Sequence, residues 1–126
     1  RAYTKLRIIE VPEFPLGRDP AWAKREERKK ITAVLKTPAF VSVCDPGGRI
    51  ITSEDFAQWL AAREREGKTV YMVIGGAAGL DQELIARADD RLSFSALTFP
   101  HQLFRLLLME QIYRGFKILR GEPYHL

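Results

Sequence analysis

Val70 to Ile74 reads VYMVI, and Gly75 to Gly79 follows it directly as GGAAG. Five consecutive apolar residues without alternation are typical of a central parallel strand that is covered on both faces. Glycine at the following turn lets a ligand approach the backbone closely, although a tight turn from strand to helix would need the same residues. Asp81 can cap a short helix that extends to about Asp89. The stretch therefore predicts a strand, a glycine-rich turn and a helix.

The flanking sequence predicts further strands and helices in alternation. Strands are predicted where β-branched and aromatic residues gather between turn-forming residues, namely Tyr3 to Val11, Ala39 to Cys44 and Leu92 to Phe99. Helices are predicted from their caps and apolar spacing, namely Asp19-Pro20 to Lys36, Thr52 or Ser53 to Gly67, and His101 to about Gly115. Short connections and this alternation indicate one α/β domain over residues 1–126, with a mostly parallel sheet and helices on both faces.

Ligands of such sheets bind beyond the carboxyl ends of the strands. The loops at that edge are Asp45 to Arg49, Gly75 to Gly79 and Phe99 to His101. The glycine spacing differs from the dinucleotide fingerprint and from the phosphate-binding loop, so a Rossmann-like nucleotide-binding protein is a weaker interpretation. Cys44 at a strand end is more typical of a small core residue than of a nucleophile. No Ser-His-Asp or Cys-His pattern points to nucleophilic catalysis.

Composition narrows the class of protein. With 126 residues, 46% hydrophobic and 29% charged, the chain is neither disordered nor a disulfide scaffold. One cysteine and no metal-ligand spacing predict a metal-free protein of a reducing compartment, the cytoplasm. No apolar run is long enough to cross a bilayer, so no membrane partner is expected. A net charge of +4 permits a polyanionic partner, and the mixed-sign stretch Lys24 to Lys30 is either a solvated face or a phosphate contact.

The last predicted helix is apolar around most of its circumference. Its apolar residues are Leu103, Phe104, Leu106, Leu107, Leu108, Met109, Ile112 and Tyr113. An amphipathic surface helix needs only one apolar stripe, so this helix must bury a second face. A homodimer interface would cover that face, and burial wholly inside the monomer is the alternative.

Four segments in order carry a resemblance to a known family. They are IGGAAG at Ile74–Gly79, LSFSALTFPH at Leu92–His101, EQIYR at Glu110–Arg114 and PYH at Pro123–His125. Together they resemble the large-subunit ribosomal RNA pseudouridine N3-methyltransferases, which are small SPOUT methyltransferases. The resemblance implies a homodimer with a C-terminal trefoil knot, S-adenosyl-L-methionine as cofactor, and methylation of a pseudouridine at N3 in 23S rRNA of the ribosome.

The same resemblance implies site residues. The cofactor cleft would be lined at the carboxyl edge by Cys44, Gly75, Gly76, Phe94, Ser95, Ala96, Leu97, Thr98 and Phe99. Catalysis would fall to His101, Arg114, Tyr124 and His125. An imide N3 is a poor nucleophile until its proton leaves, so Arg114 would stabilise the developing anion or clamp a phosphate, and His125 or His101 would accept the proton. Arg114 is also spaced to form an ordinary i, i+4 ion pair with Glu110.

Some features depart from the family pattern. Family members begin with a further strand and helix before the segment that matches Tyr3 to Val11, so we expect an unpaired sheet edge if these are missing. Glu122 stands where a histidine often precedes Pro-Tyr-His. A non-catalytic ribosome- or RNA-binding module with the same fold is therefore the alternative function. Both free rRNA and the assembled ribosome remain open as the substrate.

Overall fold

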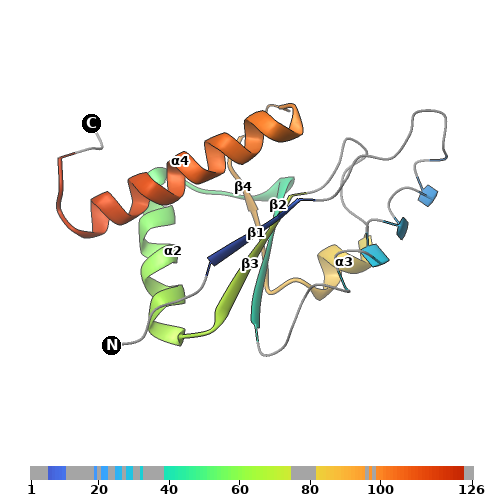
Figure 1. Ribbon diagram of the computed structural model, residues 1–126, viewed down its shortest axis with the longest axis horizontal. Helices are drawn as coiled ribbons and strands as arrows, with labels where there is room; N and C mark the ends of the chain where they lie inside the picture. Colours follow the sequence, from blue (N-terminus) through green and yellow to red (C-terminus); the bar gives the residue numbers. More distant parts are fainter. Residues whose placement is uncertain are drawn as a thin grey trace.

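The computed structural model describes residues 6–10, 19, 21–22, 25–26, 28–29, 32, 39–74, 82–95, 97 and 99–123, with the backbone alone for His101. Its strands form a four-stranded sheet in the order β1-β3-β2-β4 (Figure 1), in which β1 is Leu6–Glu10, β2 Ala39–Ile50, β3 Thr69–Ile74 and β4 Asp90–Ser93. The three neighbouring pairs are all parallel. The labelled helices are α2 Ser53–Glu66, α3 Gln82–Arg87 and α4 His101–Leu119. The predicted α/β fold with a parallel sheet is confirmed.

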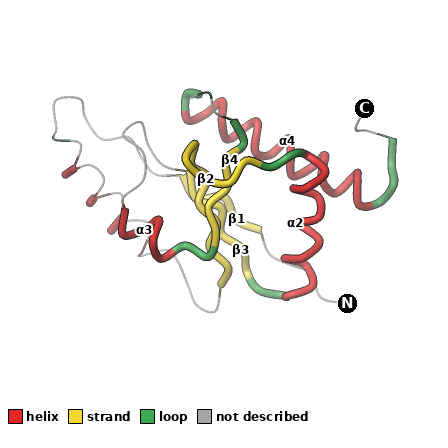
Figure 2. Tube along the Cα trace, turned by 180° about the vertical axis from the view of Figure 1, so that it is seen from behind, coloured by secondary structure: helices red, strands yellow, loops and turns green. Residues whose placement is uncertain are grey.

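Helices cover both faces of the sheet. Figures 1 and 2 show α2 and α4 on one side of the strands and α3 on the other. The larger apolar cluster joins Met72 of β3 to Phe56 of α2 and Leu108 of α4, whereas a smaller one joins Val73 to Leu84 of α3. Alternate residues of β3 thus point to opposite faces, which explains why this strand is apolar throughout.

Local signals fix both ends of α2. The Thr52 hydroxyl accepts a hydrogen bond from the Asp55 backbone N–H at 3.0 Å, and the Asp55 carboxylate accepts one from the Thr52 N–H at 3.4 Å. This reciprocal capping box satisfies two of the free N–H groups of the first turn. At the other end Gly67 adopts φ 70°, the left-handed conformation that glycine reaches without strain. The predicted bounds of this helix are confirmed.

The predicted end of the second strand at Cys44 is wrong. The chain leaves the sheet after Cys44 and returns at Arg49, and both residues pair with Leu92 of β4, so β2 continues to Ile50 around a bulge. Asp45 holds the bulge, because its carboxylate accepts hydrogen bonds from the Gly47 N–H at 3.0 Å and from Arg91 Nε at 2.7 Å. The turn-forming residues therefore make an excursion within a strand rather than its end.

Two further predicted bounds are wrong. The fourth strand covers Asp90–Ser93 instead of Leu92 to Phe99, because Ser93 Oγ donates to the Ser95 carbonyl at 3.1 Å and turns the chain away from the sheet. The last helix continues four residues beyond Gly115 to Leu119. Gly115 packs against α2, where a Cβ would lie 2.6 Å from Leu60 Cδ1, so this glycine serves a close helix contact and does not end the helix.

Gly121, two residues after the end of α4, has φ 69°. The Gly121 N–H donates to the Ile118 carbonyl at 3.0 Å, and the Glu122 N–H donates to the Lys117 carbonyl at 3.0 Å. These two bonds form a Schellman motif, which satisfies carbonyls that the last turn would leave free.

One face of α4 is left uncovered by the part of the chain that the structure describes. Leu108 is fully buried and Phe104 and Ile112 pack against the core, whereas five other apolar side chains of this helix are exposed, namely Leu103, Leu106, Leu107, Met109 and Tyr113. Burial of this helix wholly inside the monomer is therefore wrong.

The N-terminal segments agree with prediction where they are described. Residues 21–22, 25–26, 28–29 and 32 are helical, and the Ala21 N–H donates to the predicted cap Asp19 at 3.4 Å. Within Lys24 to Lys30, Arg28 contacts Glu83, and Lys29 contacts Glu26 at 3.0 Å. Among the described residues, no helix is long and apolar enough to cross a membrane.

Candidate active site

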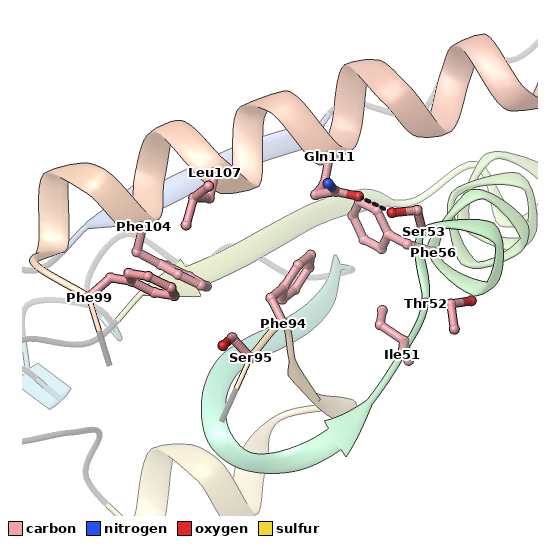
Figure 3. Close-up of a pocket in the computed structure, with 10 residues that line it drawn as sticks. All are labelled: Ile51, Thr52, Ser53, Phe56, Phe94, Ser95, Phe99, Phe104, Leu107 and Gln111. Carbon is pink, nitrogen blue, oxygen red and sulfur yellow. Dashed lines mark hydrogen bonds between the residues drawn. The ribbon is translucent and has the colours of Figure 1, made fainter. Parts of the chain in front are cut away.

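A pocket lies at the carboxyl edge of the sheet, between α4 and the start of α2 (Figure 3). Its volume is about 310 Å³, at the lower end of the range of about 300–1,000 Å³ for small-molecule sites. Its lining residues are Ile51, Thr52, Ser53, Phe56, Phe94, Ser95, Phe99, Phe104, Leu107 and Gln111. The chain brings them together because Ile51 and Thr52 connect β2 to α2, Ser53 and Phe56 lie in the first turn of α2, the segment after β4 contributes the next three, and α4 closes the opposite side.

The wall of the pocket is aromatic. Phe94 meets Phe56 edge to face at a centroid distance of 5.1 Å, and it meets Phe104 in the same way at 5.9 Å. Phe56 in turn stacks on Trp59 at 5.4 Å. Such pairs contribute about 0.5–1.5 kcal/mol each beyond the area that they bury, so the wall is held firmly. Rings on the pocket surface offer flat apolar faces to a planar ligand.

The polar groups of the pocket are uncharged. Ser53 Oγ donates to Gln111 Oε1 at 2.6 Å across the gap between α2 and α4 (Figure 3). Thr52 and Ser95 add hydroxyl groups, and none of the ten described lining residues carries a charge. A wall without cationic side chains is compatible with a positively charged ligand.

Arg114 lies beyond Gln111 on α4 and is held by an ion pair. Its Nε lies 3.1 Å and its Nη2 2.9 Å from Oε2 of Glu110, and about a quarter of its side chain is exposed. The spacing prediction of an i, i+4 pair is confirmed. Gln111 Nε2 donates to the other Glu110 oxygen at 2.9 Å. Hydrogen bonds therefore connect the polar side of the pocket with the guanidinium group.

Cys44 belongs to the core. The residue is 7% exposed and packs in the cluster with Phe56, Met72 and Leu108. Burial raises the pKa of the thiol from 9.0 to about 12, and the Asp90 carboxylate adds to the shift. The buried thiol therefore stays protonated at neutral pH, which agrees with the prediction of a core residue rather than a nucleophile.

The remaining predicted site residues have different positions. Phe94, Ser95 and Phe99 line the pocket, whereas the side chain of Leu97 is exposed to solvent. The others lie outside the described residues, namely Gly75, Gly76, Ala96, Thr98, Tyr124, His125 and the side chain of His101. In the described part of the chain, no three His, Cys, Asp or Glu residues gather as a metal site.

Sequence reasoning missed several pocket residues. The sequence predicts Ser53 only as a helix start and Phe104 and Leu107 only as apolar residues of the last helix, and it singles out neither Phe56 nor Gln111 as a site residue. The signal available for Gln111 was its place in the EQIYR segment, one residue after Glu110. Its contact with Ser53 spans 58 residues and could not be found from local spacing.

Comparison with known proteins gives a consistent result. A family model described as "Predicted SPOUT methyltransferase" matches residues 1–125. A protein of Carboxydothermus hydrogenoformans named "Ribosomal RNA large subunit methyltransferase H" is 43% identical over 129 aligned positions, which cover 98% of this chain and 81% of that protein. Proteins of the same name from Clostridium botulinum and Pelotomaculum thermopropionicum are 43% and 42% identical, with the same coverage.

Proposed function

The chain belongs to the SPOUT methyltransferase family, and on that premise we propose that it methylates N3 of a pseudouridine in large-subunit ribosomal RNA. The name shared by its relatives supports ribosomal RNA of the large subunit as the substrate. The pseudouridine and its N3 come from the resemblance of the four segments in the sequence. S-adenosyl-L-methionine is the proposed cofactor, and it would supply an electrophilic methyl group on a sulfonium centre.

The observation that carries this proposal is the pocket at the carboxyl edge of the sheet. Phe94, Ser95 and Phe99, three of the residues expected to bind the cofactor, line it. The walls fit the proposed group, because aromatic faces can receive an adenine ring and the uncharged lining does not repel a sulfonium. Gly75, Gly76, Ala96 and Thr98 are proposed to complete the cleft, with Cys44 contributing backbone.

The reaction requires that an imide proton be lost and the resulting anion be stabilised. Arg114 is the proposed stabilising cation, since Glu110 fixes the direction of its guanidinium and leaves part of it exposed. Either His125 or His101 is proposed as the proton acceptor, and Tyr124 is proposed to complete the site with the C-terminal tail. Alignment of N3 with the methyl group then falls to the rigid pocket wall.

A homodimer is proposed from the exposed apolar face of α4. Leu106 is 63% and Tyr113 52% exposed, and such a continuous apolar face on a helix is an interaction surface. A second copy of the same face would cover it. The trefoil knot and a cytoplasmic location are likewise proposed from the family.

Two measurements test the function. Calorimetry with S-adenosylmethionine should show one site per chain, and no heat at concentrations well above micromolar would contradict a methyltransferase. Ribosomes from a strain that lacks the modification should then incorporate tritiated methyl groups from labelled S-adenosylmethionine. Cofactor binding without transfer, to ribosomes and free rRNA alike, would instead indicate a non-catalytic RNA-binding module.

A further inference from the structure

A line of hydrogen bonds runs from the first residue of α2 through the pocket to Arg114. It consists of Ser53, Gln111, Glu110 and Arg114 in that order. We propose that Gln111, held by Ser53, is a positioning residue that orients Glu110 and thereby the guanidinium of Arg114. The inference rests on the proposed function, in which Arg114 faces the N3 anion.

The geometry leaves the Gln111 amide little choice of orientation. Its Oε1 accepts from Ser53 Oγ at 2.6 Å, so its Nε2 is turned toward Glu110 Oε1 at 2.9 Å. Both side chains are partly buried, and Gln111 also lines the pocket (Figure 3). An amide fixed at both ends cannot rotate without losing both bonds, so the position of α2 is transmitted to the carboxylate.

Glu110 passes this orientation to Arg114. Arg114 Nε lies 3.3 Å from Oε1, the oxygen that also accepts from Gln111, and 3.1 Å from Oε2. Arg114 Nη2 lies 2.9 Å from Oε2, so both carboxylate oxygens contact the guanidinium. The plane of the guanidinium therefore follows the plane of the carboxylate, and Gln111 restrains that plane from the other side.

An exposed i, i+4 pair on its own is a weak restraint, because long charged side chains exchange such contacts easily. The hydrogen bond from Gln111 strengthens this restraint, because Gln111 is itself held by Ser53 on a second helix. Misplacement of a reacting group by about 1 Å can cost about 100-fold in rate. Loss of the anchor should therefore lower turnover while leaving the cofactor pocket able to bind.

The main variant is Gln111→Met, which keeps a similar volume and removes both amide bonds. Ser53→Ala removes the anchor alone, Ser53→Thr restores a hydroxyl, and Gln58→Met on the exposed face of α2 is the matched control. Methyl transfer to modification-deficient ribosomes gives kcat and KM. Calorimetry with S-adenosylmethionine measures whether the pocket still binds the cofactor, and thermal unfolding measures whether the fold keeps its stability.

We expect Gln111→Met to lower kcat by about 10- to 100-fold, with KM and cofactor affinity within about threefold of the parent chain. The deficit should shrink as pH rises toward the pKa of the imide, because a substrate that is already deprotonated needs less help from Arg114. Ser53→Ala should also lower kcat, Ser53→Thr should recover part of that loss, and Gln58→Met should match the parent. In an Arg114→Ala background, Gln111→Met should have no further effect.

Unchanged kcat in Gln111→Met, or a loss that is equal at every pH and adds fully to that of Arg114→Ala, would overturn the inference. A second readout does not depend on activity. The Arg114 Nε–H resonance should exchange slowly with solvent in the parent chain and in Gln58→Met, and rapidly in Gln111→Met. If the parent chain transfers no methyl group, the proposed function is wrong. If the Arg114 Nε–H exchanges with solvent at the same rate in all variants, the positioning role of Gln111 is wrong.

Discussion

Two neighbouring glycines in the β2 bulge give a sharp test of how the pocket edge is built. A Cβ on Gly48 would lie 2.7 Å from the backbone C and O of Arg91, atoms of the paired strand that cannot move alone. A Cβ on Gly47 would lie 2.6 Å from Nη2 at the end of the Arg91 side chain. Neither glycine has a positive φ, so alanine can adopt both backbone conformations. The difference in stability between Gly47→Ala and Gly48→Ala should therefore depend on the atoms that the added methyl group contacts.

For Gly48→Ala, overpacking costs about 1–3 kcal/mol and restriction of the unfolded chain offsets about 0.4–1 kcal/mol. The free energy of unfolding should fall by about 1–2 kcal/mol. For Gly47→Ala, the Arg91 guanidinium can swing into solvent, because its side chain is 40% exposed. That movement weakens the Arg91–Asp45 ion pair, in which the Asp45 side chain is only 13% exposed, so Gly47→Ala should lower the free energy of unfolding by about 0–1 kcal/mol, less than Gly48→Ala.

Urea unfolding followed by tryptophan fluorescence measures both values. Thermal unfolding should agree, with Gly48→Ala lower in Tm by about 3–8 °C. Because the bulge leads directly into Ile51–Ser53 at the pocket wall, Gly48→Ala should also weaken binding of S-adenosylmethionine. Equal stability of the two variants, or a larger loss in Gly47→Ala, would refute this description of the bulge.

Three further predictions concern the core, the α4 surface and the end of α4. The Cys44 thiol, whose pKa burial raises from 9.0 to about 12, should resist alkylation at pH 8 until urea is added, and stability should decline as pH rises from about 9 toward 12, because only the unfolded thiol ionises there. Rapid labelling of the folded chain would contradict this burial. Leu106→Asp should sediment as a monomer, whereas Ile50→Asp, at a residue that is more exposed but lies outside α4, should remain a dimer; a persistent Leu106→Asp dimer would show that the interface lies elsewhere. The Lys117 contact lowers the pKa of the Glu122 carboxyl, so its NMR titration midpoint should rise in Lys117→Met and the contact should be lost as pH falls; an unchanged midpoint would exclude the pair in solution.

Local chemistry explains which parts of the fold could be predicted. Thr52 and Gly67 mark the ends of α2 by hydrogen bonding and by a left-handed φ, and both effects depend on near neighbours in the chain. The uniform apolarity of β3 reflects burial on both faces, which leaves a direct trace in the sequence.

Tertiary contacts explain what could not be predicted. Gly115 was expected to end α4 but instead packs on Leu60 of α2, and no nearby residue signals that partner. The bulge after Cys44 forms because Arg91, 46 residues away, reaches Asp45. The sequence shows Leu107 and Leu108 only as two apolar residues of one helix, but Leu108 is fully buried in the core and Leu107 is exposed, so only the exposed leucines are suitable for testing a dimer interface.

The residues of the candidate site also divide into those that the sequence could predict and those that it could not. Phe94, Ser95 and Phe99 could be nominated because they form a contiguous segment at the carboxyl edge of a predicted strand. Ser53 and Gln111 could not, since their contact requires α2 and α4 to be placed in three dimensions. Long-range hydrogen bonds of this kind have no periodicity to reveal them.

The most direct measurement is mass spectrometry of rRNA nucleosides after incubation of modification-deficient ribosomes with the protein and S-adenosylmethionine carrying a deuterated methyl group. The proposed function predicts one labelled methyl group per large subunit, located at N3 of a pseudouridine. Label on any other nucleoside, or unlabelled rRNA from a protein that binds the cofactor, would contradict it.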